Sequence, residues 1–456
     1  MPVVTMSLAP LHGRNLPDLV GSTPNSATPQ SEPPARKTVT ICGAGNAAHV
    51  LAALVGSMPH IRVKIWDVLE DEAKRLKQTL ESNDYKLVAS YSCGTRMPIE
   101  GKIEMVTTDA KEAVSDADML TLAVPAFAHG VYLQQAGPYL HDNMHIGALV
   151  AQGGFDWSAL SAIEQSPTHP QRISLFACET LPWACRLTEF GKSAEILGTK
   201  EDVDISVQPS EASAQISSML ESLVAKPKVT PEGHLTNECF PHFHPTSNFL
   251  TNTLMNINSV WHPCICYGRF GPHAWDQKTP FTEEQLFYEG VDDVAAKTLT
   301  DVSNEVLAVK EAIERQDASI DLSGVTHVFD WIKRSYPEDI VDRSTLKTAI
   351  VSNKAYKGLK HKMMQVDGAE EVALVPDPTY RYFSEDLPYG LVVTRGVAEL
   401  AQVPTPAMDK VIMWAQDYMG KEYLVDGRLT GRDVASTRAP QCYGINTLAT
   451  LIELSK

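Results

Sequence analysis

Short apolar runs alternate with amphipathic stretches through the first half of the chain. Each run is rich in β-branched residues, as is typical of a buried strand, and the stretch that follows carries apolar residues at helical spacing. Strands that alternate with helices predict a doubly wound α/β sheet of the Rossmann type, whose ligand lies beyond the carboxyl ends of the strands. The expected strands are 37–42, 62–66, 118–124 and 145–151, and the expected helices include 46–55 and 69–80.

The second half of the chain has a different pattern, made of long helical stretches. At 456 residues the chain exceeds one core of roughly 200 residues, so two domains are expected. The segment 199–244 is rich in Pro, Ser, Thr and His, which favours a domain boundary there. We expect a flexible tail at 1–36, an α/β domain at 37–240 and a mainly α-helical domain at 241–456. The helices expected in the last part are 249–260, 291–315, 344–352 and 405–417.

A glycine-rich motif, GAGNAA at 43–48, lies between the first strand and the first helix. In this G-x-G-x-x-A pattern, Gly43 allows the tight turn, Gly45 lets the backbone approach a pyrophosphate, and Ala48 permits close packing of the helix. The helix N-terminus can then hold phosphates through its free N–H groups. The motif predicts a dinucleotide site that includes Gly43, Ala44, Gly45, Asn46 and Ala48.

The choice of dinucleotide depends on Asp67, which follows the second strand near the offset expected of the acid that binds the ribose hydroxyls. A carboxylate there repels a 2′-phosphate, so NAD is favoured over NADP. A lone glycine pattern could be an ordinary turn, but the strand, the helix and Asp67 together favour the cofactor. Val124 and Pro125 close a later strand and fit a loop that lies against the cofactor, although a simple strand-ending proline is the alternative.

Charge and cysteine content exclude several classes of protein. A net charge of −17 is unfavourable for nucleic-acid binding, and no run of about 18 apolar residues predicts a membrane-spanning helix. The eight cysteines contain no C-x-x-C pair, which predicts free thiols in a reducing compartment such as the cytoplasm. A metal site is not expected, because the spacing does not match paired zinc ligands. The residues nearest to a metal-binding pattern are Cys264 and Cys266 with His262, and His242 with His244.

The chain resembles the opine dehydrogenases of marine invertebrates, the octopine and tauropine dehydrogenase group, from about residue 38 to 450. Only the tail and a longer stretch at about 200–250 fall outside the resemblance. It rests on separate passages in the same order, CGAGN (42–46), VPAFAH (124–129), ETLPWACR (179–186), WHP (261–263), NKAYKGL (353–359), RYFSED (381–386) and GKEYLVDG (420–427).

The resemblance implies a role for four residues. His262 would act as acid and base with Asp386 behind it, since a carboxylate on one ring nitrogen fixes the tautomer and raises the basicity of the imidazole. Arg381 would hold the carboxylate of pyruvate by two hydrogen bonds, and Gln152 would also hold the keto acid. Without the resemblance, His262 would be taken for a packed core residue and Arg381 for a partner of Asp377 or Glu385.

The resemblance also implies a reaction in which NADH reduces the imine of pyruvate and an amine to an N-(1-D-carboxyethyl) amino acid, regenerating NAD in anaerobic glycolysis. Glu179, Cys185 and Trp331 match the amine site of octopine dehydrogenases, and Glu179 could pair with the guanidinium of arginine. The alternative is that the run ETLPWAC is a scaffold shared by members that use other amines, in which case Glu179 is structural. Arginine and taurine are the amines that the resemblance favours, with alanine, glycine and β-alanine open. A monomer is expected from the family. The alternatives are a 2-hydroxyacid or glycerol-phosphate type dehydrogenase that uses Lys354 or Lys357 as its acid, and a cofactor-binding regulator without turnover.

Overall fold

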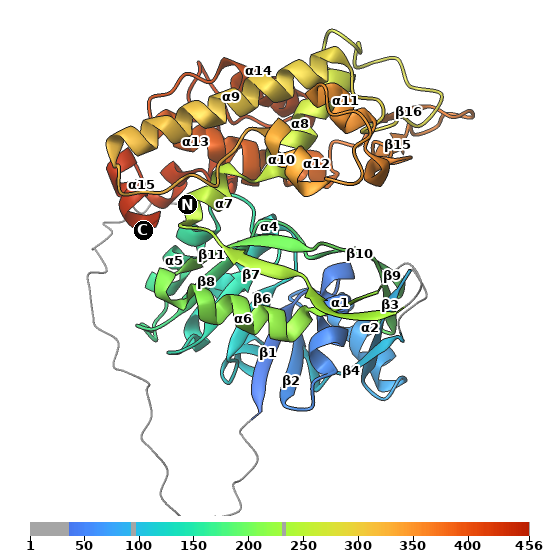
Figure 1. The fold of residues 1–456 in the computed structure, drawn as a ribbon, viewed down its shortest axis with the longest axis vertical. Helices are drawn as coiled ribbons and strands as arrows, with labels where there is room; N and C mark the ends of the chain where they lie inside the picture. The colour runs from blue at the N-terminus through green and yellow to red at the C-terminus, as the bar shows by residue number, and fades with distance from the viewer. Residues whose placement is uncertain (1–35, 93–96, 230–233, 456) are drawn as a thin grey trace, which may run out of the picture.

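The computed structural model describes residues 36–92, 97–229 and 234–455, so the tail expected at 1–36 lies outside the described residues apart from Arg36. These residues form an α/β part and a helical part that lie one above the other (Figure 1). The fold class predicted from the sequence is therefore confirmed. No helix in the described ranges is long and apolar enough to cross a membrane.

The α/β part is built on an eight-stranded sheet with the order β14-β11-β8-β7-β6-β1-β2-β5. The six strands from β8 to β5 run parallel to one another in the order of a dinucleotide-binding sheet, in which the strand order reverses between β1 and β6. Strand β11 is antiparallel to β8. The strands are β1 (Lys37–Cys42), β2 (Ile61–Trp66), β5 (Met105–Thr107), β6 (Met119–Leu122), β7 (His145–Ala148), β8 (Ser174–Cys178), β11 (Asp202–Gln208) and β14 (His242–Pro245).

Helices cover both faces of this sheet, because successive strand residues point to opposite faces. Ile41 belongs to a buried cluster that contains residues of α1 and α6, whereas Cys42 belongs to another that contains residues of α4 and α5. The helices of this part are α1 (Asn46–Gly56), α2 (Glu70–Glu81), α3 (Ala110–Val114), α4 (Ala126–Ala136), α5 (Phe155–Glu164) and α6 (Ser213–Val224).

A second sheet, of four strands in the order β4-β3-β10-β9, extends the α/β part and was not expected from the sequence. Its strands are β3 (Lys86–Tyr91), β4 (Ile99–Lys102), β9 (Trp183–Glu189) and β10 (Ser193–Thr199). A hairpin of β12 (Lys226–Val229) and β13 (Leu235–Phe240) follows α6. The boundary predicted at 240 falls just before β14, the last strand of the main sheet.

The helical part begins at Phe249, as the pattern predicts, but the single helix expected at 249–260 is wrong. The backbone leaves the helix at Met255 and Asn256, and a new helix starts at Ile257. The helices are α7 (Phe249–Leu254), α8 (Ile257–Phe270), α9 (Asp293–Gln316), α10 (Val328–Ser335), α11 (Leu346–Val351), α12 (Arg381–Ser384), α13 (Val392–Leu400), α14 (Pro406–Met419) and α15 (Leu448–Ser455), with a hairpin of β15 (Met363–Gln365) and β16 (Leu374–Pro376).

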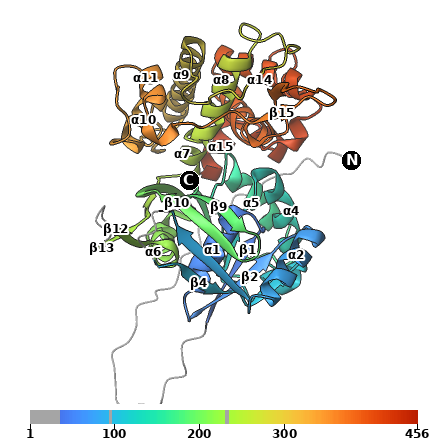
Figure 2. The same cartoon turned by 90° about the vertical axis from the view of Figure 1, so that its right-hand side faces the viewer.

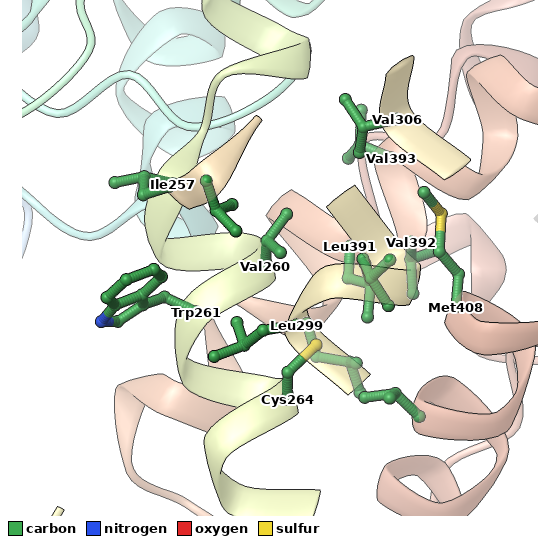
Figure 3. Packing of buried hydrophobic residues seen from close by; sticks show 14 of the residues in the cluster. Ile257, Val260, Trp261, Cys264, Leu299, Val306, Leu391, Val392, Val393 and Met408 are labelled. Carbon is green, nitrogen blue, oxygen red and sulfur yellow. The ribbon is translucent and has the colours of Figure 1, made fainter. Parts of the chain in front are cut away.

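Helix α8 passes through the core of the helical part and has two different faces. Val260 and Cys264 point toward Leu391, which ends a π-helical turn, and toward Val392, which begins α13 (Figure 3). Burial of each such side chain contributes about 1.5–3 kcal/mol, so this face anchors the helix. Trp261 points to the other side, and its ring lies 5.8 Å from that of Trp331 on α10.

The end of the chain returns to the junction between the two parts. Helix α15 lies beside the junction in both views (Figures 1 and 2). The side-chain amide of Gln208, at the end of β11, donates to the carbonyl of Leu454 in α15 at 3.1 Å. The C-terminal segment therefore ties the helical part to the α/β part.

Candidate active site

The turn after β1 leaves space for a phosphate group at the point where the strand order reverses. Gly43 has φ +96°, and a Cβ there would lie 2.3 Å from Cγ1 of Val124, so the turn requires glycine. A Cβ on Gly45 would meet no atom within 4 Å, and Gly45 and Asn46 are exposed. The N-terminus of α1 has no side-chain cap. Its free N–H groups and open approach fit the pyrophosphate of a dinucleotide.

Packing and hydrogen bonds fix the other residues around this turn. Asn46 turns away from the helix end and accepts a hydrogen bond from the Leu187 amide of β9 at 3.0 Å. Ala44 and Ala48 are buried, which permits the close packing of α1 on the sheet. Pro125 directly precedes α4, and Val124 lies against Gly43, so the loop after β6 adjoins the loop after β1.

Asp67 follows β2 at the same edge of the sheet and is 5% exposed. Its Oδ1 accepts a hydrogen bond from the Leu69 amide at 2.9 Å and one from the Tyr132 hydroxyl at 3.4 Å. Burial raises the pKa of Asp67, and these hydrogen bonds oppose the rise. A carboxylate held in this position fits the ribose hydroxyls of NAD.

The centre of the candidate site is a histidine paired with a carboxylate. Nδ1 of His262, on α8, lies 2.6 Å from Oδ2 of Asp386, which follows α12. Asp386 is fully buried and His262 is 7% exposed. The Tyr382 ring stacks on the imidazole with 3.9 Å between the centroids. Since Asp386 takes Nδ1, the geometry leaves Nε2 for exchange of protons with a substrate.

Gln152 connects this pair to the α/β part. Its Nε2 donates to Oδ1 of Asp386 at 2.9 Å, and its Oε1 accepts a hydrogen bond from the side-chain amide of Asn256. Asn256 is the residue at which the expected helix 249–260 breaks. The break therefore has a local consequence, because it directs the Asn256 amide to Gln152.

Arg381 lies one turn before Asp386 and belongs to a charged cluster at the junction. Its Nε is 3.4 Å from Oε2 of Glu385, whose Oε1 accepts a hydrogen bond from the Ala126 amide of α4 at 3.0 Å. Burial raises the pKa of Glu385, as does Asp386, whereas Arg381 and the Ala126 amide lower it. The Arg381 side chain is 46% exposed, so its Nη groups can face a ligand.

The residues expected at the amine site lie at another part of the junction. The indole Nε1 of Trp331 donates to Oε1 of Glu179 at 3.1 Å. Burial and the nearby charge of Asp204 together raise the pKa of Glu179 to about 7. Cys185 lies on β9, and burial raises the pKa of its thiol to about 11. Lys200 also belongs here, because its Nζ donates to the Leu181 carbonyl at 2.8 Å.

Tyr382, Asn256 and Lys200 of this arrangement were not identified from the sequence, whereas Glu385 was named there as an ion-pair partner of Arg381, which the structure shows. Tyr382 stands within the run RYFSED, so its neighbours Arg381 and Asp386 were a signal that could have found it. Asn256 gave no such signal. Lys354 and Lys357, the candidate acids of the alternative enzyme, are exposed. The described residues contain no group of three or more side chains that could hold a metal ion.

Comparison with known proteins matches each half of the chain to a different protein family, and it also finds relatives that match nearly the whole chain. The alpha-helical domain of NAD/NADP octopine/nopaline dehydrogenase matches residues 245–419. The N-terminus of NAD-dependent glycerol-3-phosphate dehydrogenase matches residues 38–163.

Two relatives from invertebrates match 91% of the chain. Tauropine dehydrogenase of Arabella iricolor is 37% identical over 417 residues, which are 91% of this chain and 99% of the relative. Octopine dehydrogenase of Pecten maximus is 39% identical over 414 residues, which are 91% and 98%. A solved structure of octopine dehydrogenase with NADH and pyruvate has a TM-score of 0.78 and 37% identity, and it covers 92% of this chain and 98% of that chain.

Proposed function

The chain belongs to the octopine dehydrogenase family, and we propose that it catalyses the NADH-dependent condensation of pyruvate with the amino group of arginine or taurine. The observation that carries the proposal is the pair His262 and Asp386, linked through Gln152 to the domain with the dinucleotide turn. This arrangement brings a group that can exchange protons to the crevice from which a hydride is delivered. The product would be an N-(1-carboxyethyl) amino acid, and its formation would regenerate NAD in anaerobic glycolysis.

Arg381 and Gln152 would bind the keto acid. The ion pair of Arg381 with Glu385 uses Nε, so its two Nη groups can bind the pyruvate carboxylate by two parallel hydrogen bonds. The amide nitrogen of Gln152 has a second hydrogen besides the one donated to Asp386, and it can donate to the keto oxygen.

His262 would handle the protons of the condensation. The neutral amine attacks the keto carbon, water leaves, and the imine then accepts a hydride; His262 Nε2 can accept the amine proton and supply one to the departing oxygen. Asp386 holds the opposite nitrogen and stabilises the charged ring. NADH bound at the turn of Gly43 and Gly45 supplies the hydride.

Arginine and taurine are both proposed as the amine, because an octopine dehydrogenase and a tauropine dehydrogenase are almost equally similar to this chain. Glu179 offers a carboxylate to the guanidinium of arginine. Lys200 offers a cation to the sulfonate of taurine, and its charge interacts with that of Glu179. The two substitutions E179Q and K200M separate these cases. E179Q should raise the KM only of arginine, and K200M only that of taurine.

The test of the proposed function is NADH oxidation with pyruvate and a panel of amines: arginine, taurine, alanine, glycine and β-alanine. Each is measured against a control with pyruvate alone. Oxidation that requires one of the amines supports an opine dehydrogenase and identifies its substrate. Oxidation with pyruvate alone would instead support a hydroxyacid dehydrogenase, and no oxidation with any pair would support a binding protein.

The enzyme is further proposed to act as a monomer in the cytoplasm. The monomeric state is the one that the resemblance to the opine dehydrogenases implies. The seven described cysteines form no disulfide, which is consistent with a reducing compartment. Sedimentation at enzyme concentrations used in the assay tests the first point, and localisation of the tagged full chain tests the second.

A further inference from the structure

Arg438 is a buried cation that comes after all the candidate catalytic and binding residues in the sequence. It is 2% exposed and lies in the C-terminal segment before α15, which reaches back to the junction of the two parts (Figures 1 and 2). An arginine is rarely buried to this extent without a full set of acceptors for its donors. Its partners therefore indicate what the side chain does.

The side-chain hydrogen bonds of Arg438 reach the loop that follows β7 and the first turn of α4, which follows β6. Nη1 donates to the carbonyls of Ala151 at 2.7 Å and Gly153 at 3.3 Å. Nη2 donates to the carbonyl of Ala126 at 2.9 Å and lies 2.7 Å from Nδ1 of His129. One guanidinium thus joins the loop after β7 to the start of α4 at the carboxyl edge of the sheet.

The two hydrogen bonds of Nη1 go to the carbonyls of the residues on either side of Gln152, whose backbone has φ +59°. A residue other than glycine in this left-handed region costs about 1–3 kcal/mol and persists where its surroundings fix it. The carbonyls on both sides of Gln152 are bound by Arg438, and the Gly153 amide donates to the Tyr389 carbonyl at 3.0 Å. These contacts hold the backbone that directs the Gln152 amide to Asp386.

The second pair fixes the loop that adjoins the dinucleotide turn. A guanidinium has no acceptor, so His129 accepts at Nδ1, carries its hydrogen on Nε2 and donates it to the Val124 carbonyl at 3.0 Å. Burial, together with the charge of Arg438, lowers the pKa of His129 well below its ordinary value, so the ring stays neutral. Val124 is the residue that contacts Gly43.

We propose that Arg438 is a positioning residue of the active site, which sets Gln152 against Asp386 and holds the loop 124–126 beside the cofactor turn. Arg438 touches neither substrate nor cofactor, and it acts through these two segments. The inference rests on the proposed function, because it concerns the same reaction. A lysine could not replace it, since an ammonium donates from one point and does not span acceptors on two segments.

The experiment compares R438K and R438A with the matched variant R395K in the full-length enzyme. Arg395 is also buried, at 7% exposed, but its partners Asp409, Glu399 and Gly427 all lie within the helical part. We expect R438K to bind one NADH per chain with nearly unchanged affinity, and to lose about 10²-fold in kcat/KM for pyruvate, the size typical of displaced catalytic groups. R395K should stay close to the wild type in kcat/KM per NADH-binding site.

Two further readouts separate positioning from a loss of folded protein. With NADH deuterated at the transferred position, the isotope effect on kcat should rise in R438K, because hydride transfer becomes slower, and it should stay at the wild-type value in R395K. Millimolar guanidinium, far below denaturing concentrations, should restore part of the activity of R438A and leave the activity of R395K unchanged.

Either of two results would overturn the inference: R438K with wild-type kcat/KM and isotope effect, or a loss in R438K that is fully explained by the fraction of protein that binds NADH. If R438A does not fold, R438K alone decides between them. Absence of turnover in the wild type would instead count against the proposed function.

Discussion

Nδ1 of His262 and Oδ2 of Asp386 lie 2.6 Å apart although the two residues are separated by 124 positions in the sequence. Helix α8 carries the first, and the turn after α12 carries the second. The core contacts that fix α8 against the segment after Asp386 therefore also fix the geometry of the pair (Figure 3). The same packing contacts stabilise the helical part and position the His262–Asp386 pair.

Removal of either member of this pair should affect turnover much more than cofactor binding. H262A should lower kcat by about 10²–10⁴-fold, the range of general acid–base catalysis, and D386N should lower it by about 10²-fold or more. Stopped-flow turnover and fluorescence titration with NADH measure the two effects. The control is H244A, because His244 and Asp202 form an exposed pair with the same 2.6 Å separation. Turnover that persists in H262A would assign the proton transfers to another group.

Arg381 should determine the affinity for pyruvate. Loss of a bidentate, charge-assisted contact costs about 1.5–3 kcal/mol, so R381M should raise the KM of pyruvate by about 10–150-fold. The KM of the amine should change less. R172M, which alters an exposed pair with Asp142, is a control for loss of surface charge. An unchanged KM for pyruvate in R381M would mean that Arg381 only balances Glu385.

Asp67 should set the preference for NADH. D67N keeps the hydrogen bonds of the turn in part but removes the charge that repels a 2′-phosphate. The ratio of kcat/KM for NADH to that for NADPH should fall by about 10-fold or more, since hydrogen bonds to a charged group contribute about 1.5–3 kcal/mol. A ratio equal to that of the wild type would show that the selectivity comes from elsewhere in the crevice.

Asp156, which is fully buried in the first turn of α5, should make stability fall with rising pH. Burial raises its pKa to about 7, and the Trp157 amide and the Arg438 charge only partly oppose this. A carboxyl with a raised pKa contributes its full stability below about pH 4, and the contribution is lost as the pH rises through 7. The difference from the unfolded pKa of about 3.9 corresponds to about 4 kcal/mol.

The variant D156N removes this titration. Its free energy of unfolding, from urea denaturation at pH 4–8, should depend less on pH than that of the wild type and should exceed it at pH 8. Glu179, whose pKa is also raised to about 7, is present in both proteins and leaves a common residual slope. Parallel curves for the two proteins would contradict the prediction.

Much of the fold could be predicted because it depends on local patterns. The strand Lys37–Cys42 and the start of α1 at Asn46 follow from a β-branched run that ends at glycine. The second sheet could not be predicted in this way, since β10 pairs with the distant strand β3 as well as with its neighbour β9. The break at Met255 and Asn256 was also missed, because apolar periodicity continues across it.

The candidate site was less accessible to local reasoning. His262, Asp386, Arg381 and Gln152 were identified by resemblance, and a lone histidine beside Trp261 carries no catalytic signal by itself. Arg438 was not identified at all, because its partners Ala151 and Ala126 are 287 and 312 positions away. Long-range hydrogen bonds of this kind produce no periodic pattern in the sequence.

The reaction proposed for this site is the reduction of an imine formed from pyruvate and an amine. The most direct measurement is mass spectrometry of the product formed from pyruvate, the best amine of the panel and NADH deuterated at the transferred position. The account predicts an N-(1-carboxyethyl) amino acid with one deuterium on the former keto carbon. Deuterated lactate, formed at the same rate with or without the amine, would contradict it.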